Sequence, residues 1–384
     1  MPAFVLLALL AAASDPQPPR FRYTFEFRSR LEARTGVGFG REPDIENPLL
    51  RTRAGLVFTP SRAIAFAVTL QDSRAPLYGR PAGAAARDTV DLQEGYVELF
   101  PNAERGFGAV AGRRMFAVGD GRVIGESNWR NTGRTYDTAR VYYRLPEARV
   151  EFLLVSLVDV LPDAYNRPRL ADRVWGVYNT FPRWIRSGAV DLYVLRHDRI
   201  GPGGVTAFGG RATGPLSAFR YTAEIIGETG SHAAVFAGLS RRVAIVDLSA
   251  EFKSASRDYD LLYTAVHDRF GHADLFGWRN IHNLRALARI NQTQSLAWSV
   301  MYNDNWLRDR SRALYDPRGR ALVAPAPGAR GRHIGRELDL FVTWRRSHLQ
   351  LGAGFAHLFA GRFLRTATPG VNTRYLYISQ TWTQ

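Results

Sequence analysis

Residues 21–30 read FRYTFEFRSR, and this stretch decides the fold. The aromatic residues take alternate positions: Phe21, Tyr23, Phe25 and Phe27. The polar and charged residues fall between them: Arg22, Thr24, Glu26, Arg28 and Arg30. A period of two predicts a β-strand, because successive side chains of a strand point to opposite faces. An aromatic face opposite a charged face suits a strand with lipid on one side and water on the other, whereas a soluble sandwich would turn its aromatic face inwards.

The same alternation returns along the chain and predicts about eighteen strands. Those expected in the first half are 21–32, 49–59, 63–72, 91–100, 106–115, 135–145, 149–158, 172–181 and 187–197. Those expected in the second half are 204–213, 217–228, 231–240, 243–253, 280–290, 294–303, 334–345, 347–358 and 372–383. An even number of strands is typical of single-chain bacterial barrels, and a barrel of this size encloses an aqueous channel.

The connections between these strands alternate between short and long. Proline opens the short turns at 60–62, 101–105, 146–149 and 182–186, where it fixes φ and lacks the amide of a continuing ladder. The long loops are 33–48, 73–90, 116–134, 159–171, 254–279 and 304–333. The sequence therefore predicts an all-β fold, a transmembrane antiparallel barrel with short periplasmic turns and long extracellular loops.

Composition points to an acidic partner. The 384 residues carry a formal charge of +16, and Lys253 is the only lysine among the 51 lysine and arginine residues. Arginine grips carboxylates and phosphates through two parallel hydrogen bonds, although a genome rich in G and C would also favour it over lysine. The chain has no cysteine, which suits passage through an oxidising compartment.

The N-terminal residues resemble an export signal. An apolar run at 3–10 is followed by three alanines at 11–13 and then by a polar, proline-rich stretch. We expect a signal peptide at 1–13, a polar segment at 14–20, and one barrel domain at 21–384 in the outer membrane of a Gram-negative cell. No positive charge precedes the apolar run, so the true start codon stays open.

The densest group of motifs lies at 112–140. It contains Gly112-Arg, Gly119-Asp-x-Arg-x-Ile-Gly125, Trp129-x-Asn131 and Arg134-x-x-Asp137-x-x-Arg140. Further motifs lie at 70–74, 91–98, 208–211, 271–280, 335–339 and 361–364. In their order and spacing these motifs resemble the alginate-export family of outer-membrane barrels, over nearly all of the chain after the expected signal peptide.

The resemblance implies a wide, anion-selective lumen that passes an acidic polysaccharide or its oligosaccharides by diffusion. Arginines on the water-facing parity or at loop edges would be the selectivity elements: Arg28, Arg30, Arg53, Arg74, Arg113, Arg122, Arg134, Arg140 and Arg144. Acidic residues would share the lumen with them: Glu94, Asp137, Glu224, Glu337 and Asp339. Outer-membrane lipid and periplasmic secretion proteins are the other expected partners, and a complete apolar belt would favour a monomer.

Several alternatives stay open at this point. The arginines and acids could simply pair to brace the barrel, and a general porin for small anions would share this composition. An outer-membrane hydrolase would need a serine, histidine and acid in contact, but no nucleophile motif is recognisable, so we expect no enzyme. A metal site at His267 and His272 with Asp268 and Asp274 is conceivable, yet no established metal or nucleotide motif occurs, so we expect no metal or cofactor. A nucleic-acid binder would not explain the export signal or the aromatic outer face.

Overall fold

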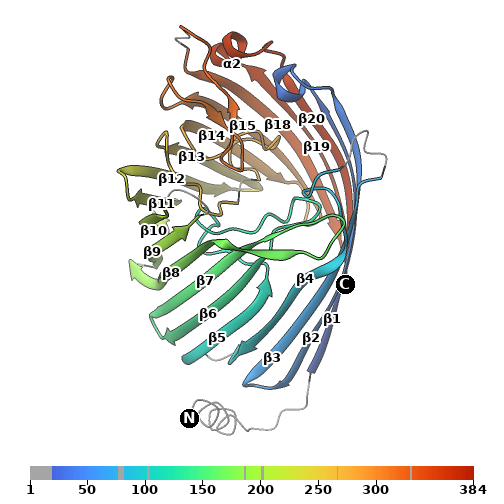
Figure 1. The fold of residues 1–384 in the computed structure, drawn as a ribbon, viewed down its shortest axis with the longest axis vertical. Helices are drawn as coiled ribbons and strands as arrows, with labels where there is room; N and C mark the ends of the chain where they lie inside the picture. Colours follow the sequence, from blue (N-terminus) through green and yellow to red (C-terminus); the bar gives the residue numbers. More distant parts are fainter. Residues whose placement is uncertain are drawn as a thin grey trace.

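The computed structural model describes residues 20–76, 82–101, 104–185, 187–199, 203–265, 267–328 and 331–384. Within them the chain forms a closed antiparallel barrel of 18 strands (Figure 1). This confirms the predicted all-β barrel and its strand number. The expected signal peptide at 1–13 lies outside the described residues, and of the polar segment only Arg20 is described, as the first residue of the first strand.

Eighteen strands make the wall, and each pairs with the next wall strand in the sequence. The first nine are β1 (Arg20–Thr35), β2 (Ile45–Ser61), β3 (Ile64–Arg74), β4 (Asp88–Leu99), β5 (Gly106–Arg114), β6 (Tyr136–Leu145), β7 (Ala148–Asp159), β8 (Arg167–Ile185) and β9 (Gly188–Asp198). The others are β10 (Val205–Leu216), β11 (Phe219–Glu228), β12 (His232–Val243), β13 (Val246–Ala255), β14 (Ile281–Asn291), β15 (Leu296–Leu307), β18 (His333–Arg346), β19 (Leu349–Ala360) and β20 (Thr373–Thr383). Pairing of β20 with β1 closes the ring.

The connections at the two ends of the barrel differ as the sequence predicts. At one end they have two to six residues, whereas the other end carries the long loops, including 115–135, 256–280 and 308–332. Three small elements lie in these loops: η1 (Val37–Phe39), the hairpin of β16 (Leu314–Tyr315) with β17 (Ala321–Val323), and α2 (Arg362–Ala367). The alternating pattern of the wall strands carries no signal for these elements.

No helix in the described parts of the chain has the length and hydrophobicity of a membrane span.

The wall has an apolar outer face and a polar inner face. Leu340 and Ile378 are about half exposed on the outside, at 47% and 60%, and aromatic residues such as Phe355 accompany them. The alternate positions point inwards, where Arg28 and Glu337 are buried. The period of two read from the sequence is therefore the inside–outside alternation of a closed sheet.

Two of the long loops, 115–135 and 256–280, fold into the barrel (Figure 1). Val123 and Ile124 of the first loop are buried against Tyr259 and Tyr263 of the second, in one apolar cluster with wall residues. A short parallel bridge joins Ile124 to Tyr263. The barrel interior therefore holds a small packed core made by its own loops.

The outer face generates a stability prediction. Leu340→Arg should lower the free energy of unfolding from lipid vesicles by about 2–4 kcal/mol, because an arginine at mid-wall must enter hydrocarbon. Gln380→Arg, on the same parity but near the short-turn end, should cost about 0–1 kcal/mol. Urea titration of both variants tests this, and equal costs would contradict the assignment of this face to lipid.

Candidate functional site in the lumen

Loop 115–135 is anchored to the first two strands through its backbone. Arg28 of β1 donates to the carbonyl oxygens of Asn128 and Arg130 at 3.0 Å each, and Arg51 of β2 donates to the same two carbonyls at 3.0 and 3.1 Å. Arg30 donates to the carbonyl of Trp129 at 2.8 Å and lies over its ring. A loop inside a barrel has no ladder partner, so these guanidinium groups satisfy carbonyls that would otherwise be unpaired.

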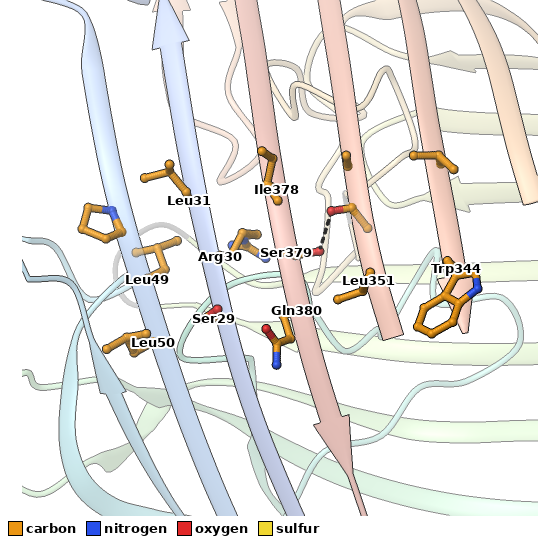
Figure 2. A pocket seen from close by; sticks show the side chains of 14 residues that line it. Ser29, Arg30, Leu31, Leu49, Leu50, Trp344, Leu351, Ile378, Ser379 and Gln380 are labelled. Carbon is orange, nitrogen blue, oxygen red and sulfur yellow. Dashed lines mark hydrogen bonds between the residues drawn. The ribbon is translucent and has the colours of Figure 1, made fainter. Parts of the chain in front are cut away.

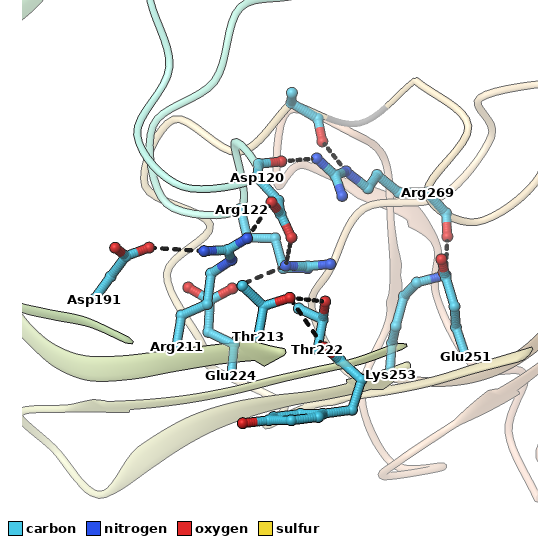
Figure 3. Close-up of polar contacts among 12 residues, drawn as sticks. Asp120, Arg122, Asp191, Arg211, Thr213, Thr222, Glu224, Glu251, Lys253 and Arg269 are labelled. Atoms are coloured by element: carbon cyan, nitrogen blue, oxygen red, sulfur yellow. Dashed lines mark hydrogen bonds and ion pairs between the residues drawn. The ribbon is translucent and has the colours of Figure 1, made fainter. Parts of the chain in front are cut away.

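The same loop reaches the opposite wall. Arg122 lies 2.8 Å from Asp120 and 3.1 Å from Glu224 of β11, and Arg211 of β10 binds Asp120 at 2.6 Å and Asp191 at 2.9 Å (Figure 3). In an 18-stranded ring β10 stands nine strands from β1, so loop 115–135 spans the full width of the lumen.

The motifs singled out in the sequence are the two attachment points of this loop. Asn131 of the Trp-x-Asn motif donates to the carbonyls of Leu50 and Ala86 at 2.9 and 2.8 Å. Gly119 has φ +52°, and an added Cβ would lie 2.6 Å from the hydroxyl of Tyr178. The glycine of Gly-Asp-x-Arg therefore allows the close approach by which the aspartate that follows it reaches the wall.

Loop 256–280 crosses the lumen as well. The hydroxyl of Tyr263 donates to Asp172 of β8 at 2.8 Å, and Asp260 lies 3.0 Å from His197 of β9. Farther along, the amide of Ala273 donates to Glu337 of β18 at 2.9 Å. Two contacts join this loop to loop 115–135. Arg134 donates to the Tyr263 carbonyl at 2.8 Å, and a β-bridge connects Ile124 with Tyr263.

Several charged side chains lie close together where the loops meet. Burial raises the pKa of Asp120, but its hydrogen bond with Arg211 and the charge of Arg122 bring the pKa below its usual value. Burial and the neighbouring Arg122 lower the pKa of Arg269 to about 10. Lys253 of β13 donates to the carbonyl of Arg269 at 2.5 Å and pairs with Glu251 at 2.9 Å (Figure 3).

A cavity with a volume of ≈ 550 Å³ opens between these loops and the wall at the long-loop end. Its arginines are Arg130, Arg134, Arg169, Arg199, Arg279, Arg318 and Arg320, and its acids are Asp159, Asp172 and Asp260. Burial and the charges of Arg134 and Arg318 lower the pKa of Arg130 to about 10. In the described part of the chain, Arg130 and Arg318 have no ion pair, so the cavity has a surplus of positive charge.

The structure places seven of the nine arginines expected from the sequence on the inner side of the barrel or in its crossing loops, and all seven have protein partners. Arg28, Arg30, Arg122 and Arg134 anchor the loops, as described above. Arg53 donates to Gln71 at 2.6 Å, and Arg140 binds Glu151 at 2.5 Å and lies over the Phe116 ring. Arg144 lies at the short-turn end, where it donates to the Phe100 carbonyl at 3.1 Å.

Two of the expected arginines lie elsewhere. Arg74 is on the outward parity of β3 and pairs with Asp72 at 2.7 Å, half exposed. Arg113 of β5 binds Asp137 of β6 at 2.8 Å. The two residues are paired in the register, and Asp137 is on the same outward parity of β6 as the exposed Val141. A bulge in β4 and the glycine before Arg113 lie beside this position, so Arg113 and Asp137 belong to the wall and not to the lumen surface.

The remaining acids lie inside, where they hold loop backbone or arginine. Glu94 accepts from the amide of Met115 at 3.0 Å, and Glu224 pairs with Arg122. Glu337 and Asp339 are completely buried and accept from the amides of Ala273 and His272. Sequence alternation missed the cavity arginines Arg130, Arg199, Arg279, Arg318 and Arg320, because loop positions have no period that reports their direction, and it did not single out Arg169 near the start of β8.

The histidines of loop 256–280 contact carboxylates. His267 lies 2.7 Å from Asp274, and His272 hydrogen-bonds Asp268. Ligand atoms of His267, Asp268 and His272 all lie within 4.8 Å of one another, a set of two nitrogens and one oxygen that would suit a divalent transition metal. The His267 ring also stacks on Trp129 at 4.4 Å, so this cluster joins the two crossing loops.

Comparison with known proteins supports the likeness read from the motifs. The family model for alginate export matches residues 20–244 and 249–377. No curated protein sequence matches the chain.

Solved structures share its fold at low sequence identity. OccAB1 of Acinetobacter baumannii is 10% identical with a TM-score of 0.69, over 97% of this chain and 99% of that one. OccK3 (OpdO) of Pseudomonas aeruginosa is 10% identical with a TM-score of 0.66, over 95% of both chains. OccK2 (OpdF) of P. aeruginosa, crystallised in complex with glucuronate, is 9% identical with a TM-score of 0.65, over 94% of this chain and 97% of that one.

The anchoring arginines generate a prediction about pore size. The double variant Arg28→Ala and Arg51→Ala should raise single-channel conductance by roughly a factor of two, because loop 115–135 loses the hydrogen bonds that these two arginines donate to its carbonyls. Planar-bilayer recording measures the change, and Arg74→Ala on the outer face is the matched control. Unchanged conductance in the double variant would show that this loop does not narrow the pore.

Proposed function

This chain belongs to the alginate-export family of outer-membrane β-barrels, and we propose that it is a passive, anion-selective channel for an alginate-like polyuronate. On this proposal the polymer diffuses through the lumen with no bond made or broken. The barrel acts as a monomer, because its apolar face surrounds the whole wall. Periplasmic secretion proteins would deliver or receive the polymer at the short-turn end.

The observation that carries the proposal is the surplus of arginine in the cavity at the long-loop end. Arg130 and Arg318 face this cavity without ion pairs among the described residues, while Arg199 and Arg169 keep acidic partners. A polyuronate has one carboxylate on every sugar, so neighbouring arginines can bind successive carboxylates in turn. Partial pairing keeps each contact weak enough for the chain to move on.

The crossing loops support the selectivity part of the proposal. Both loops cross the lumen from one side of the wall to the other. Charge-assisted hydrogen bonds to their backbone carbonyls hold them in place, for example those from Arg51 and Arg134. A narrow passage with low-dielectric walls strengthens the field of the arginines beside it. The crystallised complex of OccK2 with glucuronate, a single uronate, supports uronate binding in this fold.

A second candidate is a general porin for small anions. The same anchoring favours it, because loop 115–135 is attached at both ends and makes a fixed constriction. A polymer conduit and a small-anion porin therefore differ in whether a polyuronate enters the passage.

Polymer block distinguishes the two candidates. In planar bilayers we expect anion-selective current that polyuronate blocks and a neutral glucan of equal length does not. The double variant Arg130→Gln and Arg318→Gln should weaken block by about tenfold, since two charge-assisted contacts are lost. The matched control is Arg289→Gln, an inward arginine near the short-turn end outside the cavity.

Each result decides between the candidates. Anion-selective current that polyuronate does not affect would identify a small-anion porin. Equal block of the wild type and the double variant by polyuronate would show that the polymer does not bind in this cavity.

A further inference from the structure

The outer face of the barrel carries a group of basic residues at the long-loop end of β14 to β20. We call this group the basic ladder. Its members are His282, Arg308, Arg332, His333, Arg336, His357 and Arg374. They lie on strands or just beyond strand ends that are adjacent in the wall. None of them lines the cavity described above.

The strand register places the ladder in neighbouring rows. Trp306 of β15 pairs with His282 on one side and His333 on the other, and the ring centroids of Trp306 and His333 lie 5.8 Å apart. One row nearer the short-turn end, Asp304 pairs with Arg336. Next along the wall, His357 of β19 pairs with Arg374 of β20.

These side chains point away from the lumen. Arg336 shares its parity with Leu338 and Leu340, and Arg374 shares its parity with Leu376 and Ile378, all exposed on the apolar outer face. The ladder therefore lies at the long-loop border of the apolar outer face on these strands.

The charge of the ladder is poorly balanced within the protein. Asp304 is the acidic partner of two ladder residues: it lies 2.8 Å from His333 and 3.2 Å from Arg336. Among the described residues, Arg308, Arg332 and Arg374 have no ion pair. Another sector of the same end differs, because Arg173 and Arg196 both bind Asp198 at 3.4 and 3.2 Å.

A shallow apolar groove lies below the ladder on the same sector. It has a volume of ≈ 490 Å³, and Leu31, Trp344, Leu351 and Ile378 lie around it (Figure 2). Its floor is low because the outward β19 position between Leu351 and Phe355 is the small residue Ala353. Ile378 is four positions after Arg374 on β20, which is about 13 Å along the strand.

We propose that the ladder and groove together bind a phosphorylated glycolipid of the outer leaflet, of the lipid A type. Such a lipid has phosphate groups on a sugar head and several acyl chains below it. The unpaired arginines would bind the phosphates through bidentate hydrogen bonds, and one acyl chain would lie in the groove. The geometry supports this because basic residues stand directly above an apolar, recessed surface facing lipid.

The test measures lipid retained by the detergent-purified barrel in native mass spectrometry. The probes are bisphosphorylated lipid A, the same lipid after enzymatic dephosphorylation, and inorganic phosphate. We expect saturable binding of bisphosphorylated lipid A, weakened about tenfold or more in the triple variant Arg332→Gln, Arg336→Gln and Arg374→Gln. The double variant Arg173→Gln and Arg196→Gln is the matched control and should bind as the wild type does.

A second variant tests the groove without touching the arginines. Ala353→Phe fills the floor and should weaken lipid A binding severalfold while leaving binding of inorganic phosphate unchanged. Equal lipid binding by the triple variant and the control would overturn the proposal, as would equal binding of dephosphorylated lipid. Inorganic phosphate binding as tightly as lipid A would also overturn it. Polyuronate block, recorded on the triple variant, should persist, so failure of this site and failure of the channel proposal are distinguishable.

Discussion

Hydrocarbon offers no hydrogen-bond partner, so every backbone amide and carbonyl of a membrane-spanning sheet must be satisfied within the protein. Here the pairing of β20 with β1 removes the last free edges. Closure forces charged residues of the alternating pattern into the lumen, and it leaves the long loops at one end without ladder partners. Loops 115–135 and 256–280 enter the same lumen, where wall guanidinium groups and carboxylates meet their carbonyls and amides. The interior is therefore organised by the same requirement that closes the wall.

Arginine serves this arrangement because its planar head has five donors and keeps its charge. Arg28 and Arg51 each reach more than one loop carbonyl. A lysine has a single ammonium group and could not span two carbonyls with the same fixed geometry. Different arginines have different surroundings. Arg28 and Arg51 hold a loop, Arg318 lines the cavity without an ion pair among the described residues, and Arg374 faces outwards. A bias towards arginine in the composition therefore conceals several distinct structural roles.

Part of the site could be predicted from sequence. The motifs at 119–125 and 129–131 drew attention to the loop that crosses the lumen, and they prove to be its attachments to opposite walls. Parity correctly placed Arg28 and Arg53 inside. Parity wrongly placed Arg113 in the lumen. A bulge in the neighbouring strand β4 and the strand end beside Arg113 put its side chain in the wall. Arg318 could not be oriented at all, since a residue in a long loop has no periodic neighbours.

The sequence by itself determined the strands, their number and which face of most strands meets lipid, because alternation is a local property that any paired strand must satisfy. It also indicated which end carries long loops, since turn prolines and connection lengths are local too. Only the tertiary structure decided that two loops cross the lumen and that most inward arginines are engaged by backbone carbonyls. It likewise decided that the surplus charge lies in a cavity at the long-loop end and on one outer sector. Those outcomes depend on contacts between residues more than a hundred positions apart, such as Arg28 with Arg130 or Arg134 with Tyr263, and no local pattern reports them.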